Sequence, residues 1–250
     1  MVIAFAVAVV TVPVGVSGAV FLVPVQVSLL DVASPAVTPT NLLYNIVAVP
    51  GALWRYRTAE GFRIELVRAM LVGTLPGVVA GAVVRVEVAP GGGVFRLVIA
   101  GLLAPLGVWL LVERRAPDGT RLRFGLRWVA TLAAATGFVG GVYGIGGGSI
   151  LGPVLVAAGY PIASVAPSAL VTTLLTSVAG VITFSVLAIT GGDSAAPVWH
   201  LGVLLGTGGL VGGYVGARVQ SRLPVALLKR GLGVLSLLLA ASYVVAASAT

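Results

Sequence analysis

The chain has no cysteine, one histidine and few charged side chains among its 250 residues. Without cysteine there can be no disulfide bond, no thiolate catalysis and no thiolate-ligated metal site. The single imidazole, that of His200, cannot form a histidine metal cluster, so the sequence predicts neither a metal site nor a cofactor. Charged residues make up 9% of the chain, against about 25% in soluble domains, and 58% of the residues are hydrophobic. This composition excludes a water-soluble fold.

Acidic residues are scarcer than basic ones: the chain has seven Asp and Glu but fifteen Lys and Arg, for a net charge of +8. The basic residues stand in the gaps between apolar runs, as in cytoplasmic loops of membrane proteins, and are not gathered as on a nucleic-acid-binding face. We therefore expect a lipid bilayer as a partner and no nucleic acid. Every acidic residue lies at a segment end or in a loop, so a carboxylate proton relay has no obvious position, and Asp31, which closes the first segment, is the best of several weak candidates.

The apolar residues form eight segments, and the first and the fifth are unusual. A simple transmembrane span needs roughly 20 residues. The first and fifth segments are about thirty residues long and carry Gly and Pro in their middle, which favours a helical hairpin or a broken helix over one straight span. No Lys or Arg precedes the first segment, so we expect it to belong to the mature protein and not to a signal peptide. The segments are 1–30, 36–54, 64–84, 94–112, 128–158, 162–189, 197–217 and 225–247.

The two halves of the chain repeat each other weakly but in the same order, which indicates an internal duplication. We therefore expect a first membrane repeat at 1–113, a basic cytoplasmic linker at 114–127 and a second membrane repeat at 128–250. The matching pairs are Gly18–Pro24 with Gly147–Pro153, Val37–Thr40 with Val165–Ser168, Val72–Thr74 with Leu205–Thr207, and Arg85 with Arg218.

The basic residues also favour one of two topologies, because cytoplasmic loops are enriched in Lys and Arg. If all eight segments span once, nine of the fifteen basic residues fall on one side. If the first and fifth segments instead dip in and return, the halves are inverted and only Arg85 and Arg96 lie outside. The loop at Asp193 would then be external and the loop at Arg121 internal. The sequence thus predicts an all-α integral membrane protein with two inverted-topology repeats, each a broken or re-entrant segment plus three transmembrane helices.

A glycine-dense break inside the fifth segment, with a weaker counterpart in the first, is the strongest functional signal. In lipid, unwound backbone is tolerated only where it lines a cavity or is buried in protein, and paired breaks are typical of secondary transporters. A helix that restarts after the break presents N–H groups and a positive dipole end, both of which suit an anion. Tight helix packing is the other reading of such glycines. The residues predicted to hold the anion are Gly146, Gly147, Gly148 and Ser149, with Gly18 and Ala19 in the first segment.

Polar side chains at membrane depth add further candidates. Asn41 and Asn45 are four residues apart and share a helix face, and burying two asparagines there favours a role toward the substrate. Thr172 and Thr173 are also candidates, although their hydroxyls can bond to their own helix and contribute only to packing. No Lys or Arg lies deep in an apolar segment, so an anion would be held by dipoles and neutral donors.

Four stretches of the chain share a pattern of glycine, proline and polar residues: Gly137–Gly148 with Pro153, Ala166–Thr173, Gly18–Pro24 and Val37–Asn45. In these stretches the chain resembles the sulfite exporter TauE/SafE family of membrane transporters. The resemblance covers nearly the whole chain and implies transport of small sulfur-containing or carboxylate anions, such as sulfite, sulfoacetate or related organosulfonates. The run Val171–Leu174 departs from the Ala-x-x-Thr-Ser run that the family tends to show.

The sequence therefore predicts a multi-pass permease of a prokaryotic inner membrane, which moves a small anion by alternating access around a midplane site between the broken segments. It is not expected to be an enzyme. An anion channel with the same site and a non-transporting scaffold remain alternatives. An intramembrane hydrolase using Ser149 is disfavoured, because the string Gly147–Leu151 lacks the last glycine of the Gly-x-Ser-x-Gly elbow and nothing orients His200. The substrate, the coupling ion, the direction of transport and the formation of a homo-oligomer stay open.

Overall fold

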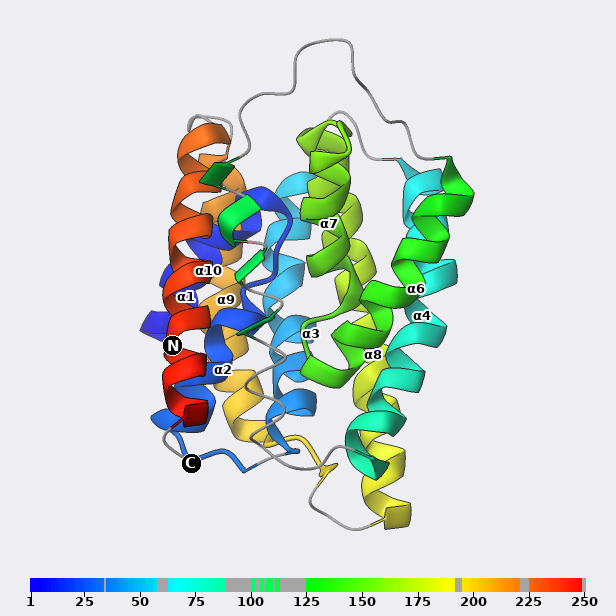
Figure 1. The fold of residues 1–250 in the computed structure, drawn as a ribbon, viewed down its shortest axis with the longest axis vertical. Coiled ribbons are helices and arrows are strands. Elements are labelled where there is room, and N and C mark those ends of the chain that lie inside the picture. The colour runs from blue at the N-terminus through cyan, green and yellow to red at the C-terminus, as the bar shows by residue number, and fades with distance from the viewer. Residues whose placement is uncertain are drawn as a thin grey trace.

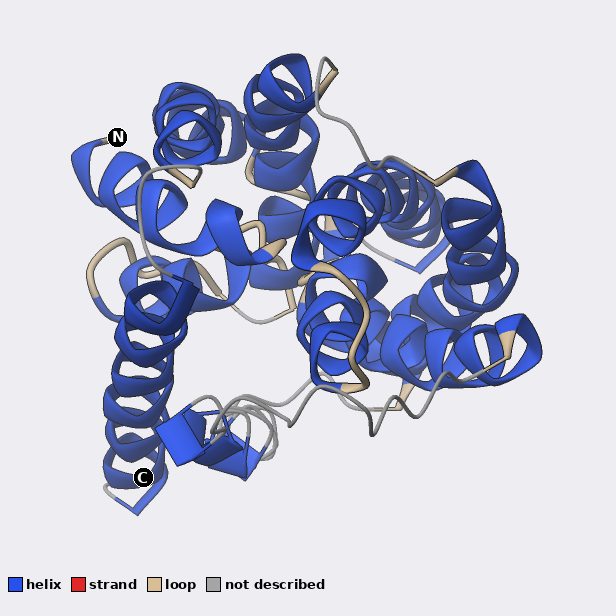
Figure 2. Cartoon of the chain, turned by 90° about the horizontal axis from the view of Figure 1, so that it is seen from above, coloured by secondary structure: helices blue, strands red, loops and turns tan. Residues whose placement is uncertain are grey.

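In the computed structural model, the part of the chain that is described is helical and contains no strand (Figure 2). The described residues are 1–33, 35–57, 63–88, 100–101, 104–105, 107–109, 111–112, 125–191, 195–220 and 225–248. The helices lie side by side along one long axis (Figure 1). Their bounds are α1 Val2–Thr11, the short 3₁₀ helix η1 Val12–Val14, α2 Ala19–Ser28, α3 Val37–Tyr56, α4 Ile64–Glu87, α6 Leu126–Tyr143, α7 Gly147–Ala157, α8 Ile162–Gly191, α9 Trp199–Val219 and α10 Val225–Ser248.

Both long apolar segments are interrupted, as their glycine and proline content predicted. The first forms α1, η1 and α2, and the second forms α6 and α7. Each doubles back on itself: Gly18 at the start of α2 lies against Val7 of α1, and Gly147 lies against Gly137 of α6. Each segment is therefore a helical hairpin with a break at its tip. The predicted segment 94–112 lies largely outside the described residues.

Close backbone contacts at glycines pack the hairpins against helices of the other half. In α4, Gly73, Gly77 and Gly81 meet the backbone of α6 over successive turns. In α9, Gly208 and Gly212 meet the backbone of α1 at Met1 and Phe5 in the same way. Small residues allow this close approach, which is how helices associate in lipid, where no hydrophobic force drives them together. The glycine row of α4 therefore serves helix packing.

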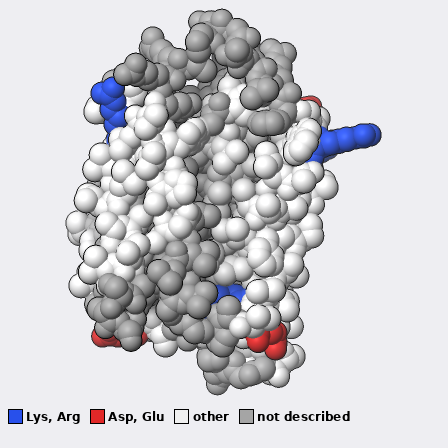
Figure 3. All heavy atoms as spheres, in the orientation of Figure 1, with Lys and Arg blue, Asp and Glu red and all other residues white. Residues whose placement is uncertain are grey.

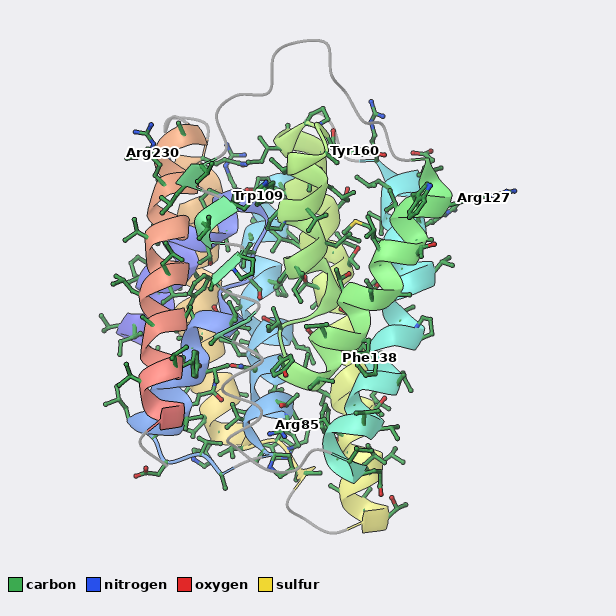
Figure 4. The ribbon with its side chains drawn as sticks, viewed as in Figure 1. Arg85, Trp109, Arg127, Phe138, Tyr160 and Arg230 are labelled. Atoms are coloured by element: carbon green, nitrogen blue, oxygen red, sulfur yellow. The ribbon has the colours of Figure 1, made fainter. Side chains whose placement is uncertain are left out.

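The surface of the molecule is that of a membrane protein. In the view of Figure 3, the described charged side chains lie toward the two ends and the middle of the molecule is uncharged. Three described helices, α4, α8 and α9, are long and apolar enough to cross a membrane. Figure 4 labels Arg127 near one end and Arg85 near the other, and we name the two ends after these residues.

Most described basic residues lie at the Arg127 end. The end of α3, the start of α4 and the end of α9 are there, and Arg230 at the start of α10 is beside them (Figures 1 and 4). Arg85, in the last turn of α4, lies at the opposite end. The basic residues at the Arg127 end are Arg55, Arg57, Arg63, Arg68, Arg127, Arg218 and Arg230. The loops at Arg121 and Asp193 lie outside the described residues.

Candidate functional site

The break in the first hairpin is held open by two glycines in the left-handed region. Gly15 ends η1 with φ 81°, and Gly18 precedes α2 with φ 89°. Glycine adopts this conformation without the clash that a Cβ would introduce. Between them, Ser17 is 1% exposed, and its carbonyl accepts a hydrogen bond of 3.0 Å from the Tyr44 hydroxyl.

The break in the second hairpin uses the same device. Gly144 ends α6 with φ 70°, the usual left-handed glycine cap, and Gly146 precedes α7 with φ 76°. Gly147, by contrast, does not have a positive φ. A Cβ on Gly147 would instead lie 2.6 Å from the Cγ2 of Thr74, so this glycine serves close packing against α4.

The two breaks meet through a pair of serines. The Ser17 N–H donates to the hydroxyl of Ser149 at 3.2 Å, and that hydroxyl lies 3.1 Å from the hydroxyl of Ser17. The same Ser149 oxygen lies 3.1 Å from the Thr173 hydroxyl. Ser17 directly precedes the cap of α2, and Ser149 is in the first turn of α7. The N-termini of two half-helices, each with a positive dipole end, therefore come together at buried hydroxyls.

Asn45 of α3 supports the second break. Its amide nitrogen donates to the carbonyl of Ile145 at 3.3 Å and to the Ser177 hydroxyl at 3.1 Å. The side-chain oxygen of Asn45 is buried without a hydrogen-bond partner. Asn45 is therefore beside the break, as the sequence predicted, and its amide holds the unwound backbone in place.

Asn41 lies one turn away and has a different partner. Its side-chain oxygen accepts a hydrogen bond from the amide of Gln26, which α2 contributes. The Asn41 amide nitrogen is buried and has no partner. A Cβ built on Gly144 would lie 3.0 Å from the Asn41 Cβ, so this pair also borders the second break.

The two threonines predicted for the site separate in the structure. Thr173 reaches Ser149 and packs against Gly146 and Gly148. Thr172 donates to the carbonyl of Ser168 in its own helix at 2.9 Å and faces the sulfur of Met70. Thr173 thus belongs to the junction of the breaks, whereas Thr172 belongs to the packing of α8 against α4.

The backbone donors predicted for the anion are partly engaged. The Ser149 N–H donates to the Gly146 carbonyl at 3.2 Å, and the Ala19 N–H lies 3.4 Å from the hydroxyl of Ser17. The N–H groups of Gly147 and Gly148 occupy the first two positions of α7, where a helix provides no partner of its own. These two groups are the backbone donors best placed to meet a ligand.

Sequence reasoning missed several polar groups of this region. Ser17, Tyr44 and Gln26 are all fully or almost fully buried and bond directly to the breaks or to Asn41. A signal existed for Gln26, since it is the only glutamine in an apolar segment. The burial of Arg85 was not predicted either: it follows the end of an apolar segment, yet it is 0% exposed.

The groups considered for other chemistry lie elsewhere. His200 is exposed in the first turn of α9, whereas the Ser149 hydroxyl is engaged by Ser17 and Thr173. Asp31 is exposed in the connection between α2 and α3. Within the described residues, no group of three or more His, Cys, Asp or Glu could hold a metal ion.

An all-helical chain with apolar spans and paired breaks of this kind belongs to the class of membrane transport proteins. The sequence model of the sulfite exporter TauE/SafE family matches residues 1–243 of the 250. The chain therefore belongs to this family of membrane transporters, as the glycine motif predicted. Comparisons with curated proteins and with solved structures gave no match.

Proposed function

We propose that the protein is a secondary transporter of a small anion, with sulfite or an organosulfonate as substrate. The observation that carries this proposal is the meeting of the N-termini of α2 and α7 at Ser17 and Ser149. Two helix N-termini aimed at one point give positive potential and N–H donors without a basic side chain. Membership of the sulfite exporter family supports the choice of an oxyanion.

The proposed site lies between the breaks. The N–H groups of Gly147 and Gly148 would donate to the anion, and Gly146 and Gly18 would allow it close to the backbone. The hydroxyls of Ser149 and Thr173 are already within 3.1 Å of each other and would turn toward it. Asn45 would keep the second break in its unwound form, Asn41 would add a donor, and Ala19 would add a backbone N–H.

We further propose that the two halves form an inverted repeat. In Figure 1 the first hairpin is followed by α3 toward the Arg127 end and α4 back, whereas the second hairpin is followed by α8 away from that end and α9 back. Each hairpin also packs on the helix that follows the other hairpin. Gly144 of the second hairpin packs on Thr38 of α3, and Gly15 of the first packs on Ala166 of α8, which lies 128 positions after Thr38. The concentration of basic residues supports a cytoplasmic Arg127 end in a prokaryotic inner membrane.

In the proposed mechanism, one half rocks against the other so that the site opens to each side in turn. A cavity of about 290 Å³ lies between α3 and α8 at the Arg127 end, lined by Leu53, Tyr56, Arg57, Pro167 and Val171. A buried apolar cluster that includes Val12, Val49 and Leu170 packs the helices next to it. This cavity would be the inner vestibule, and separation of the cluster would connect it to the site.

Counterflow in proteoliposomes tests the carrier. Vesicles loaded with unlabelled sulfite should accumulate labelled sulfite transiently, because a carrier exchanges one anion for another. With the membrane potential clamped, a channel would equilibrate the label without this overshoot, and a scaffold would move none. A serine-reactive probe that labels Ser149 would instead favour the hydrolase.

The inverted topology can be tested in the naturally cysteine-free chain. Single cysteines at Asp193 and Arg121 should differ in their reaction with an impermeant thiol reagent added to intact cells. We expect labelling at position 193 alone. Equal labelling of both positions from outside would contradict the inversion.

A further inference from the structure

Arg85 is the buried basic residue of the described chain, and its counterpart in the other half is not buried. Arg85 lies in the last turn of α4 and is 0% exposed. Arg218 occupies the corresponding turn of α9 and is exposed. The last turn of α9 thus carries a solvent-exposed guanidinium at the position that corresponds to Arg85. Packing of the helix end therefore does not by itself require a buried guanidinium at the end of α4.

Arg85 is linked to two neighbouring helices, α3 and α6. Its Nε donates to the Thr38 hydroxyl at 3.4 Å, and this hydroxyl donates to the carbonyl of Val142 near the end of α6 at 3.1 Å. In membrane proteins, an ionisable residue inside the protein is by default a sign of an ion path.

A line of polar side chains leads from Arg85 to the breaks. Thr38, Asn41 and Asn45 are three and four positions apart, so they lie along one face of α3. Thr38 contacts Arg85, and Asn45 holds Ile145 in the second break. Between them, the amide nitrogen of Asn41 is a buried donor without a partner.

We propose that Arg85 and Thr38 form a second anion site at the Arg85 end of the path to the breaks, and that the amide of Asn41 is shared between this site and the one at the breaks. The site rests on the proposed transport function and adds an outer station, where the anion is held on one side of the membrane. The guanidinium supplies full charge and planar donors suited to an oxyanion, and Asn41 supplies a neutral donor. This charge selects anions over neutral sulfur compounds of the same size.

The test is exchange of labelled sulfite by right-side-out vesicles, with the external sulfite concentration varied. Arg85→Gln should raise the external KM about tenfold or more, because hydrogen bonds to charged groups carry that much free energy, with a smaller change in maximal rate. Arg85→Lys should restore most of the affinity, since it keeps the charge. Arg218→Gln is the matched control and should leave the external KM unchanged.

A second variant covers the case in which Arg85→Gln does not fold. Asn41→Asp is nearly isosteric and places a carboxylate where the anion would be held, one turn from the contact of Arg85 with Thr38. We expect this variant to lose external sulfite affinity while its thermal stability stays equal to the parent's or rises. Unchanged affinity in Asn41→Asp would overturn the outer site.

Binding by the purified proteins separates the two proposals. Thermal stabilisation by sulfite, thiosulfate and sulfate should be present in the parent and weakened in Arg85→Gln. If sulfite stabilises the parent and Arg85→Gln equally, or if Arg85→Lys does no better than Arg85→Gln in external KM, only the outer site is wrong. If no anion stabilises or exchanges in the parent, the proposed function fails and the outer site fails with it.

Discussion

The two breaks have the same plan but different packing. Each is flanked by two glycines with positive φ, yet α2 begins with Ala19 and Val20, whereas α7 begins with Gly147 and Gly148. Ala19 and Val20 are buried against apolar side chains. A Cβ on Gly148 would collide with the carbonyl oxygen of Ala169 in α8. The start of α7 is therefore packed backbone against backbone, whereas the start of α2 is packed through side chains. We expect α7 to tolerate substitution in its first turn far less than α2 does.

The largest effect should follow from adding one methyl group to α7. Gly148→Ala places a Cβ against the Ala169 carbonyl and 2.7 Å from the Thr173 hydroxyl, and backbone cannot move aside cheaply. We expect a loss of about 3 kcal/mol in the free energy of unfolding. Val20→Ala, the matched change in α2, should cost only about 1–2 kcal/mol. Thermal unfolding of both purified variants measures the difference, and equal losses would contradict the contrast between the breaks.

A smaller difference is expected at the glycines that end the first helix of each hairpin. Gly144→Ala introduces the left-handed strain and a clash with the carbonyl of Thr38, and should cost about 2–3 kcal/mol. Gly15→Ala has the same strain but meets the Ala166 Cα at 3.0 Å, so about 1–2 kcal/mol is expected. The order of the two unfolding temperatures is the check. A less stable Gly15→Ala protein would reverse the comparison.

Next come the side chains that support the breaks from α3 and α8. Asn45→Leu leaves the buried Ile145 carbonyl without its donor and should cost about 2 kcal/mol. Thr173→Val, at the corresponding position of α8, loses its bond with Ser149 and should cost about 1 kcal/mol. Transport by the folded variants distinguishes the roles: if Asn45 contacts the anion, Asn45→Leu should also abolish flux. A variant that is less stable but still transports would limit Asn45 to support.

The smallest effects should be at the carbonyls near the end of each hairpin's first helix. Thr38→Val removes both the donor to Val142 and the acceptor of the long hydrogen bond from Arg85, and should cost about 1 kcal/mol in unfolding free energy. Gln220→Leu removes the donor to Pro13, held at 2.7 Å, at a partly exposed place where water can replace it. We expect about 0.5 kcal/mol or less for Gln220→Leu. If both variants lower the unfolding temperature equally, the carbonyls of Val142 and Pro13 are equally shielded from water.

The helices could be predicted from the sequence because hydropathy and glycine content are local properties. The predicted segments 36–54 and 162–189 became α3 at Val37–Tyr56 and α8 at Ile162–Gly191. The location of both breaks followed from glycine in the middle of an overlong run. The partners of polar side chains did not follow, because they come from residues far away in the chain. Ser17 and Ser149 are 132 positions apart, and Asn45 and Ile145 are 100 apart.

The sequence by itself determined that the chain is a helical membrane protein, that it has two interrupted segments and which family it resembles. These properties depend on the length of apolar runs and on where glycine permits unwound backbone. Only the tertiary structure decided that the positive φ is at Gly146 and not at Gly147, and that Thr173 faces Ser149 while Thr172 faces Met70. Neighbouring residues on a helix point about 100° apart, so their roles depend on which helix packs on which side. The burial of Arg85 was decided in the same way. From the sequence, an arginine near the end of an apolar run is expected to be exposed, and only the packing of neighbouring helices buries it.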